Sequence, residues 1–379
     1  MEGDTPHLIS FIHTSIRGEM RRKVFRGMGC RQVGRSGLWV SEVGLGLWKW
    51  GDPSYDGSKV GEHEGFKILD RALELGVFFW DTANSYNWGS GNSERLIGRY
   101  FASRGRRVRE QVVLATKIVN SVREEHEEKA DFTPNQRGAS RLYIRRAVEG
   151  CLRRLQTDYI DLLYVHYPVL DEEGEYETPL EETWGTLDDL ISDGVVYYLG
   201  VSNYNIRQIE EAREALRKVA KDASRRIVAV QNPYNLLERD GVSKEEGVGE
   251  AEFLRYIREA GIGLVPYFPL AAGMLTGKYR KDNIDRVEGH IIDDKLQDRY
   301  FTEANFRAVE LLQEFAERKG VTLPQLAIAW LLSHEEVCGV IAGVTRMEHL
   351  EDNAKATSIE LTEEDLREID EILERAGVR

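Results

Sequence analysis

Four side chains that could move or steer a proton follow successive apolar runs of the chain: Asp81, Tyr86, Lys117 and His166. A tyrosine phenol has an unperturbed pKa near 10, and a lysine cation within about 4–6 Å favours its phenolate form, so Lys117 would make Tyr86 a better acid. Asp81 would keep Lys117 charged, and His166, as a neutral imidazole, could donate a hydrogen bond to a carbonyl oxygen. The set would suit protonation of an oxygen on which negative charge develops, as when hydride adds to a carbonyl.

Each of these residues also has an ordinary structural explanation when it is taken alone. Asp81 could cap the following loop, Lys117 could lie on the surface, and His166 could be a hydrogen-bonded core histidine. Their joint occurrence near the ends of apolar runs favours the catalytic interpretation. Because none of them can supply hydride, a nicotinamide cofactor would have to do so.

The elements that must position these residues recur regularly along the chain. Short, nearly continuous apolar runs are typical of strands buried on both faces, and they begin near residues 43, 77, 112, 160, 195, 227, 262 and 337. Segments with helical periodicity lie between runs, and four of them end in a glycine where a left-handed C-cap is expected: Gly76, Gly194, Gly261 and Gly320. The alternation predicts an α/β fold, a (β/α)8 TIM barrel. A doubly wound open sheet is the alternative, but no glycine-rich phosphate fingerprint follows the first run.

In such a barrel, the carboxyl ends of the strands form the face that carries the site. Polar or aromatic residues stand there at every run: Trp48, Asp81, Lys117, His166, Ser202, Gln231, Tyr267 and Thr345. Two long loops, residues 118–138 and 279–300, are expected at the same face. Residues 30–379 are predicted to form one domain that begins with a β-hairpin around "GRSG" at 34–37, and residues 1–29 to form a mobile extension.

Composition excludes several classes of function. The formal net charge of −14 argues against binding to nucleic acid or to an acidic membrane surface, and no apolar run approaches the roughly 20 residues of a membrane span. Cys30, Cys151 and Cys338 lack the spacing of a zinc site or a disulfide framework, which favours a reducing, cytoplasmic setting. The eight histidines include no HxH or HExxH pair, so no metal site is expected.

A series of motifs identifies the chain as resembling a known family. They are "GLGLW", "DTANSYNWGSGNSERLIG", "ATKI", "LRRLQTDYIDLLYVHYP", "GVSNYN", "VQNPYNLLER", "PYFPLAAGMLTGKY" and "IAGVTRMEHLEDN", in this order over roughly residues 30–375. Together they resemble the aldo-keto reductases. The stretches "GRSGLWVSEVGLG" and "TLPQLAIAW" are most similar to the branch that contains the beta subunits of voltage-gated potassium channels and their microbial relatives.

The resemblance implies roles for individual residues. The catalytic tetrad falls on Asp81, Tyr86, Lys117 and His166, with Tyr86 as general acid and base. Nicotinamide contacts fall on Ser202, Asn203, Gln231 and, as a stacking ring, Tyr267. The pyrophosphate belt would comprise Pro269, Leu270, Gly273, Leu275, Gly277 and Lys278, and the adenosine end Gly343, Thr345, Arg346, His349, Asp352 and Asn353. The substrate pocket is expected at Trp48, Trp50 and Trp88, although Trp50 and Trp88 could instead pack loops.

The cofactor that the resemblance implies is NADP(H). Arg346 could grip a 2′-phosphate dianion with its fork of donors, and Lys278 adds a second local positive charge to an acidic protein. The sequence departs from the family pattern at Val169, where an acid often follows "HxP", at His349, where glutamine is more usual, and at Leu47, where serine or threonine is common. The departure at Val169 bears on how His166 is placed.

The expected function is therefore reduction of a small aldehyde or ketone by an NADP(H)-dependent oxidoreductase. The alternative is a regulatory subunit that binds NADP(H) as a redox reporter and docks on a partner, as the channel beta subunits suggest. The same tetrad serves both, so the motifs do not separate them. A homo-oligomer is possible in either case, because no exposed apolar stripe decides the question.

Overall fold

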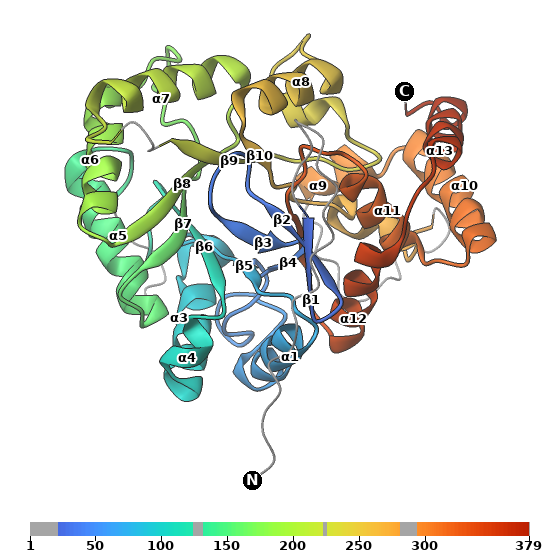
Figure 1. Cartoon of the computed structure of the whole chain (residues 1–379), viewed down its shortest axis with the longest axis horizontal. Coiled ribbons are helices and arrows are strands. Elements are labelled where there is room, and N and C mark those ends of the chain that lie inside the picture. The colour runs from blue at the N-terminus through green and yellow to red at the C-terminus, as the bar shows by residue number, and fades with distance from the viewer. Residues whose placement is uncertain (1–21, 124–131, 223–225, 281–293, 379) are drawn as a thin grey trace.

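Eight parallel strands form the central sheet of the computed structural model, which describes residues 22–123, 132–222, 226–280 and 294–378 (Figure 1). Their order is β10-β9-β8-β7-β6-β5-β4-β11. The strands are β4 (Val43–Gly46), β5 (Phe79–Asp81), β6 (Val113–Ile118), β7 (Ile160–Val165), β8 (Val196–Ser202), β9 (Ile227–Gln231), β10 (Gly263–Leu264) and β11 (Val340–Gly343). Each of the expected apolar runs overlaps one of them, so the predicted succession of strands along the chain is confirmed.

The sheet curls until its two edge strands, β10 and β11, meet. Cys338 donates a backbone hydrogen bond to Leu264 of β10 at 2.9 Å, and Ile341 of β11 donates one to Pro266 at 3.1 Å. These bonds join the two edges of the parallel sheet and bring all strand ends to a common face. The inference that the tetrad residues would share one face depends on this curvature.

Helices surround the curled sheet (Figure 1). The longer ones are α1 (Glu62–Glu74), α3 (Asn92–Arg104), α5 (Arg141–Leu155), α6 (Leu180–Ser192), α7 (Ile206–Val219), α8 (Glu250–Ala260), α10 (Glu303–Lys319), α11 (Leu323–Leu332), α12 (Met347–Lys355) and α13 (Glu363–Ala376). The short ones are α2 (Tyr86–Gly89), α4 (Arg106–Arg109), α9 (Asp294–Tyr300) and the 3-10 turns η1 (Pro134–Gln136), η2 (Asp240–Ser243), η3 (Ala271–Thr276) and η5 (Ala356–Ser358). All four glycines expected to end helices have φ between 70° and 76°.

A separate antiparallel sheet precedes the first parallel strand. It consists of β1 (Arg22–Phe25), β2 (Met28–Gln32) and β3 (Trp39–Ser41), and Gln32 pairs with Trp39 across the predicted hairpin. Strands therefore begin at Arg22, which corrects the expected boundary: residues 22–29 belong to a sheet rather than to a mobile extension. The polar strand β1 was missed because its alternation is weak and its pairing partner, not its own sequence, stabilises it.

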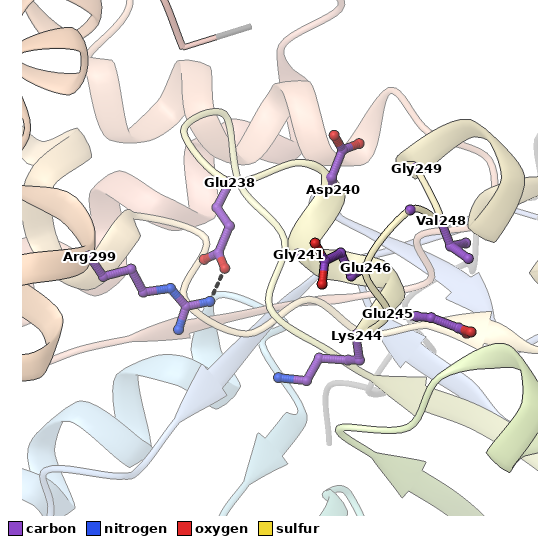
Figure 2. A pocket seen from close by; sticks show the side chains of 10 residues that line it. Glu238, Asp240, Gly241, Lys244, Glu245, Glu246, Val248, Gly249 and Arg299 are labelled. Atoms are coloured by element: carbon purple, nitrogen blue, oxygen red, sulfur yellow. Dashed lines mark hydrogen bonds and ion pairs between the residues drawn. The ribbon is translucent and has the colours of Figure 1, made fainter.

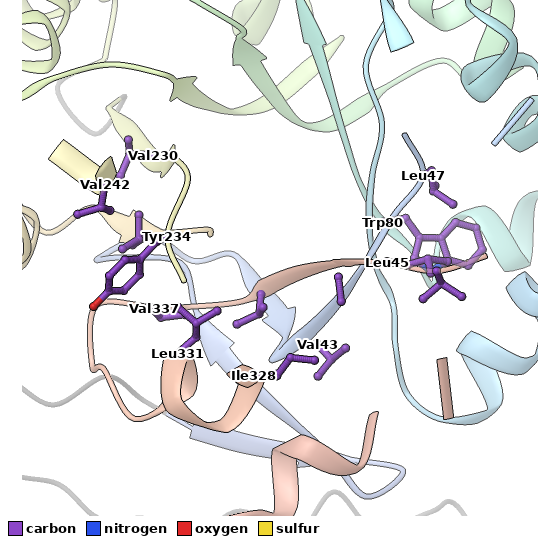
Figure 3. Close-up of a cluster of buried hydrophobic side chains, with 14 of the residues drawn as sticks. Val43, Leu45, Leu47, Trp80, Val230, Tyr234, Val242, Ile328, Leu331 and Val337 are labelled. Carbon is purple, nitrogen blue, oxygen red and sulfur yellow. The ribbon is translucent and has the colours of Figure 1, made fainter. Parts of the chain in front are cut away.

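The core lies between the parallel sheet and the helices. In Figure 3, strands supply Val43 and Val230 while α11 supplies Ile328 and Leu331. Within the ranges that the structure describes, none of the helices combines the length and apolar character needed to cross a membrane. The central parts of the two long loops, residues 124–131 and 281–293, lie outside the described residues, so their expected position at the substrate face stays a prediction.

Candidate active site

The Asp81–Lys117 pair forms the centre of the candidate site. Asp81 is the last residue of β5, and Lys117 lies on the neighbouring strand β6; both side chains are 1% exposed. Lys117 Nζ donates to Asp81 Oδ1 at 2.6 Å, to the Thr82 carbonyl at 2.8 Å and to the Tyr86 hydroxyl at 2.7 Å. All three protons of the ammonium group therefore have an acceptor, and one of these acceptors is the phenol expected to act as the acid.

Tyr86 stands at the start of the short helix α2, where its hydroxyl group also donates to Asp81 Oδ1 at 3.1 Å. Burial, followed by the charge of Asp81, raises the pKa of Tyr86 well above its usual value. The sequence argument expected Lys117 to lower this pKa, and the direction is the opposite, because desolvation of the phenolate outweighs the nearby cation. The phenol is thus protonated at neutral pH, as a proton donor must be.

Lys117 experiences competing effects. Burial lowers the pKa of its ammonium group, while the charges of Asp81 and then Glu94 raise it. The two carboxylates therefore oppose the effect of burial on Lys117, which is the direction in which the sequence analysis expected Asp81 to act.

His166 follows β7 directly and is 8% exposed. Its ring stacks on Tyr167, with centroids 4.6 Å apart, and meets the ring of Tyr86 edge-on at 6.2 Å. Burial and the Lys117 cation lower the pKa of the imidazole well below its ordinary value, so His166 is neutral near pH 7. A neutral imidazole beside Tyr86 can donate one hydrogen bond to the oxygen that Tyr86 protonates.

Helix α3 holds the strand ends that carry the tetrad, and sequence reasoning missed this. Thr82 follows Asp81 directly in the chain, and its hydroxyl group lies 2.8 Å from that of Ser93 on α3. Glu94 accepts a hydrogen bond from Thr116, next to Lys117, at 2.6 Å, and is paired with Arg154 of α5 at 2.7 Å. The signal was available in "GNSERLIG", where an acid occupies a helix position that must face the sheet.

Three residues assigned to the nicotinamide lie against the tetrad. Gln231 Nε2 donates to Asp81 Oδ2 at 2.9 Å, so the amide occupies the second oxygen of the catalytic carboxylate. The Ser202 hydroxyl group donates to the Gln231 carbonyl at 2.8 Å, and Asn203 Nδ2 donates to the Ser202 hydroxyl at 3.2 Å. The three polar groups thus lie together beside Asp81, and their contacts with a nicotinamide stay predictions.

Tyr267 lies at the edge of this polar group, partly exposed. Its hydroxyl group donates to Asn203 Oδ1 at 2.8 Å, and Asn203 in turn donates to the His166 carbonyl at 3.0 Å. Asn203 has a positive φ of 63°, an uncommon conformation for a non-glycine residue that the two contacts hold in place. A flat ring at this position could stack on a planar ligand group.

The segment assigned to the pyrophosphate is a tight series of turns around η3. Positive φ angles occur at Phe268, Ala271, Ala272, Gly273 and Gly277. Such conformations aim successive backbone N–H groups in similar directions and often form anion sites. The other assigned residues, of which Pro269 and Leu275 are buried and Leu270 is partly exposed, shape the same segment.

Three basic side chains come together beyond this segment. The charge of Arg346 adds to burial in lowering the pKa of Lys278, and the charges of Arg346 and Lys278 add to burial in lowering the pKa of His349. His349 Nδ1 lies 3.4 Å from the Thr345 hydroxyl group, at the start of α12. Lys278 and Arg346 thus place positive charge locally on a protein whose net charge is −14, which would suit an anionic ligand.

The remaining residues assigned to adenosine have different surroundings. The Asp352 carboxylate accepts hydrogen bonds from Thr322 at 2.7 Å and Gln325 at 2.6 Å, at the N-terminus of α11. Gly343 ends β11 and is exposed, whereas Asn353 is buried. Contacts of these residues with adenosine stay predictions, and Asp352 already has a structural role.

The three tryptophans assigned to the substrate pocket have different surroundings. Trp50 is 1% exposed and its indole N–H donates to the Val344 carbonyl at 2.7 Å, so its assignment to the pocket is wrong: it is a core residue. Trp48 is partly exposed and packs on Phe268, a ring that sequence reasoning missed, with centroids 5.7 Å apart. Trp88 is 77% exposed, two residues after Tyr86, with φ of 60°. Trp48 and Trp88 thus remain candidates for substrate contact.

A hollow on the surface lies elsewhere. It is lined by residues of the loop 238–249 together with Arg299 of α9, and Figure 2 shows Arg299 and Glu238 pointing toward each other as an ion pair. The Tyr300 hydroxyl group also donates to Glu238, at 2.6 Å. None of the residues assigned to catalysis or cofactor binding lines this hollow, so we interpret it as the place where α9 attaches.

Comparison with known proteins shows the family to which the chain belongs. The model of the aldo/keto reductase family matches residues 42–374. The uncharacterized oxidoreductase YrpG of Bacillus subtilis is 34% identical over 359 residues, covering 91% of this chain and 96% of that protein. A probable voltage-gated potassium channel subunit beta of Arabidopsis thaliana is 34% identical over 334 residues (88% and 92%). The L-glyceraldehyde 3-phosphate reductase of Escherichia coli K12 is 30% identical over 352 residues (91% and 92%). This chain therefore belongs to the aldo/keto reductase family.

Proposed function

We propose that this protein reduces small aldehydes or ketones to alcohols with NADP(H), on a (β/α)8 barrel whose long loops frame the substrate. The observation that carries the proposal is the position of the Tyr86 hydroxyl group, within hydrogen-bond distance of both Lys117 (2.7 Å) and Asp81 (3.1 Å). A protonated phenol held in this way is placed to give up its proton in one defined direction. The oxidoreductases among the relatives support the same reaction class.

In the proposed reaction, bound NADPH would supply the hydride that adds to the carbonyl carbon. Tyr86 donates its phenolic proton to the carbonyl oxygen as negative charge develops there, which yields the alcohol. Lys117, kept charged by Asp81, stabilises the phenolate that remains, and His166 holds the carbonyl oxygen with a hydrogen bond.

The residues present fit the proposed cofactor. Ser202, Asn203 and Gln231 offer the hydroxyl and amide groups that a carboxamide pairs with. The Lys278 and Arg346 cations are suited to phosphate, and the Arg346 guanidinium would favour NADP(H) over NAD(H) because it can bind the 2′-phosphate with two parallel hydrogen bonds.

Replacing Tyr86 with phenylalanine tests the proposed chemistry. We expect Tyr86→Phe to lower kcat by about 10²- to 10⁴-fold, the range for loss of a general acid, while the Kd for NADPH measured by fluorescence changes little. Turnover like that of the unmodified protein would reject the role of Tyr86.

Replacing Arg346 with alanine tests the cofactor. We expect the Kd for NADPH to rise about 10- to 100-fold, because a hydrogen-bonded charge pair contributes about 1.5–3 kcal/mol, with little change in the Kd for NADH. Arg367→Ala, an exposed arginine on α13, is the matched control. Equal weakening of both cofactors would contradict selection for the 2′-phosphate.

A second candidate function is regulation of a partner through cofactor binding, which the similarity to channel beta subunits favours. Steady-state oxidation of NADPH across aldehydes, diketones, quinones and phosphorylated aldehydes separates the two. Turnover supports the enzyme, and tight NADPH binding without turnover supports the regulatory subunit.

A further inference from the structure

The orientation of the His166 ring is controlled from several sides. The ring stacks on Tyr167 and meets Tyr86 edge-on, and both contacts define its plane. The His166 backbone is held as well: its N–H donates to Ile118 at 3.1 Å, and its carbonyl accepts from Asn203 at 3.0 Å. None of these contacts decides which ring nitrogen carries the proton. The location of that proton determines whether the imidazole can donate a hydrogen bond to a substrate carbonyl group.

The tautomer depends on the partner of Nδ1. Asn120 Nδ2 lies 3.4 Å from His166 Nδ1, and within the described ranges this is the one side-chain hydrogen bond to the imidazole. The family often has an acid at position 169, but this chain has Val169, whose apolar side chain offers the ring no hydrogen bond. The amide group of Asn120 is thus the polar side-chain group beside His166 Nδ1.

Asn120 is itself held in place. Its backbone carbonyl accepts hydrogen bonds from Asn84 Nδ2 at 3.1 Å and from the Tyr143 hydroxyl group. Its Nδ2 is also 3.3 Å from the Ser85 hydroxyl oxygen, one residue before Tyr86. Asn120 therefore connects β6, the loop after β5 and the ring of His166.

We propose that Asn120 is a positioning residue that selects the tautomer of His166 protonated on Nε2. An amide NH₂ group can only donate, so Nδ1 must present its lone pair and the single proton of a neutral imidazole must reside on Nε2. That N–H is then the one available to the substrate carbonyl. The inference rests on the proposed reaction for its catalytic meaning but not for the tautomer itself.

Two further facts agree with this assignment. Burial and the charge of Lys117 keep His166 neutral, so one ring nitrogen is always unprotonated near pH 7. Lys117, Tyr86 and Tyr167 are the titratable groups that face the ring, and each would be disturbed by an additional charge on the imidazole.

Nitrogen-15 NMR of the full-length labelled protein tests the tautomer directly. The His166 resonances are assigned by their loss in His166→Gln. We expect Nδ1 to behave as an acceptor and Nε2 as a protonated nitrogen in the unmodified chain. In Asn120→Asp the carboxylate accepts from the ring, so Nδ1 becomes protonated and Nε2 either loses its proton or shares the charge of an imidazolium.

Kinetics provide the second readout. Asn120→Asp should lower kcat on the order of 10²-fold or more, as expected when a catalytic histidine is held in the wrong tautomer, with an unchanged Kd for NADPH. Asn120→Ala should produce a mixture of tautomers and a loss of about tenfold. Asn92→Asp, which places an acid in the first turn of α3, is the matched control and should change neither tautomer nor kcat.

An Nδ1-protonated His166 in the unmodified protein would overturn the proposal, and so would an Asn120→Asp variant with the tautomer and turnover of the parent. These failures are distinct from failure of the proposed function. If Tyr86→Phe kept full turnover, the proposed role of Tyr86 as general acid would be rejected, while the NMR result on the His166 tautomer would still hold.

Discussion

Two buried carboxylates, at opposite ends of the parallel strands, are each paired with a cation, but the two cations differ in their other contacts. Asp81 ends β5 at the carboxyl face and is 1% exposed; Glu42 precedes β4 at the amino face and is fully buried. Each accepts hydrogen bonds from a cation, Lys117 at 2.6 Å for Asp81 and Arg31 at 2.8 Å for Glu42. The difference lies in what else the two cations contact.

Arg31 directs its remaining donors at the backbone carbonyl of Leu332, which ends α11, and at those of His334 and Val337 in the segment that follows. An arginine does not lose its proton in proteins, so the Arg31 cation is a permanent link between the N-terminal sheet and the C-terminal part of the chain. Lys117 instead donates to Tyr86, a titratable group, and its own pKa is shifted. The ion pair at the amino face therefore contacts only groups that hold the fold together, whereas the ion pair at the carboxyl face contacts the residue that we propose as the acid.

The largest expected effect comes from removing the ion pair at the carboxyl face as a unit. Asp81→Asn combined with Lys117→Met should lower kcat by about 10²- to 10⁴-fold, because Tyr86 loses both partners. The free energy of unfolding should be unchanged or higher, since replacing a buried ion pair with neutral groups is often neutral or stabilising. Kinetics and urea unfolding measure the two quantities. A double variant that is inactive because it is much less stable would erase the contrast with Glu42.

Removing the carboxylate at the amino face should have the converse result. Glu42→Gln leaves Arg31 partly unpaired, so we expect the free energy of unfolding to fall by about 3 kcal/mol with kcat unchanged at temperatures where the protein is folded. Glu64→Gln, in an exposed pair with Lys67 at 3.5 Å, is the control and should change stability by less than about 1 kcal/mol. A large change in kcat for Glu42→Gln would show that the two ends are coupled.

The carboxyl face should also make stability depend on pH through His166. The folded-state pKa of His166 is lowered relative to its ordinary value of 6.5, so below that pH the unfolded chain binds a proton that the folded chain does not. Stability is therefore full above about pH 6.5 and is lost as pH falls, by at most about 1.4 kcal/mol per pH unit for one proton.

Urea unfolding of the unmodified chain and of His166→Gln between pH 7.5 and 5 measures this contribution. The variant should lose less stability over the same interval. His334 and His349, whose pKa values are also lowered, remain in both proteins, so the difference isolates His166. Identical pH dependence would mean that His166 is not held neutral.

The smallest effect is expected at Trp88. Because its side chain is 77% exposed, Trp88→Ala should leave the free energy of unfolding within about 0.5 kcal/mol, while the KM for aromatic aldehydes rises about 2- to 10-fold through loss of ring contact. Short aliphatic aldehydes should show little change. Trp50→Phe should behave oppositely, with lower stability and unchanged KM, because Trp50 is a core residue.

Periodicity was sufficient to predict the parallel strands and the glycine caps, because burial on both faces and left-handed backbone leave local signals in composition. The Asp81–Lys117–Tyr86 group was predictable for a related reason: polar residues at the ends of parallel strands must share a face. Trp50 was assigned wrongly because a tryptophan near a site looks the same in sequence whether it packs inward or outward. Its contact with Val344 joins residues that are 294 positions apart in the chain.

The sequence by itself determined the alternation of strands and helices, the residue types at the strand ends and membership of the aldo/keto reductase family. Only the tertiary structure decided that burial dominates the pKa of Tyr86, that Glu94 and Ser93 hold the two strands of the ion pair, and that Asn120 faces the Nδ1 atom of His166. The physical reason is that strand order follows from local patterns, whereas desolvation and hydrogen bonding depend on distances between residues remote in the chain.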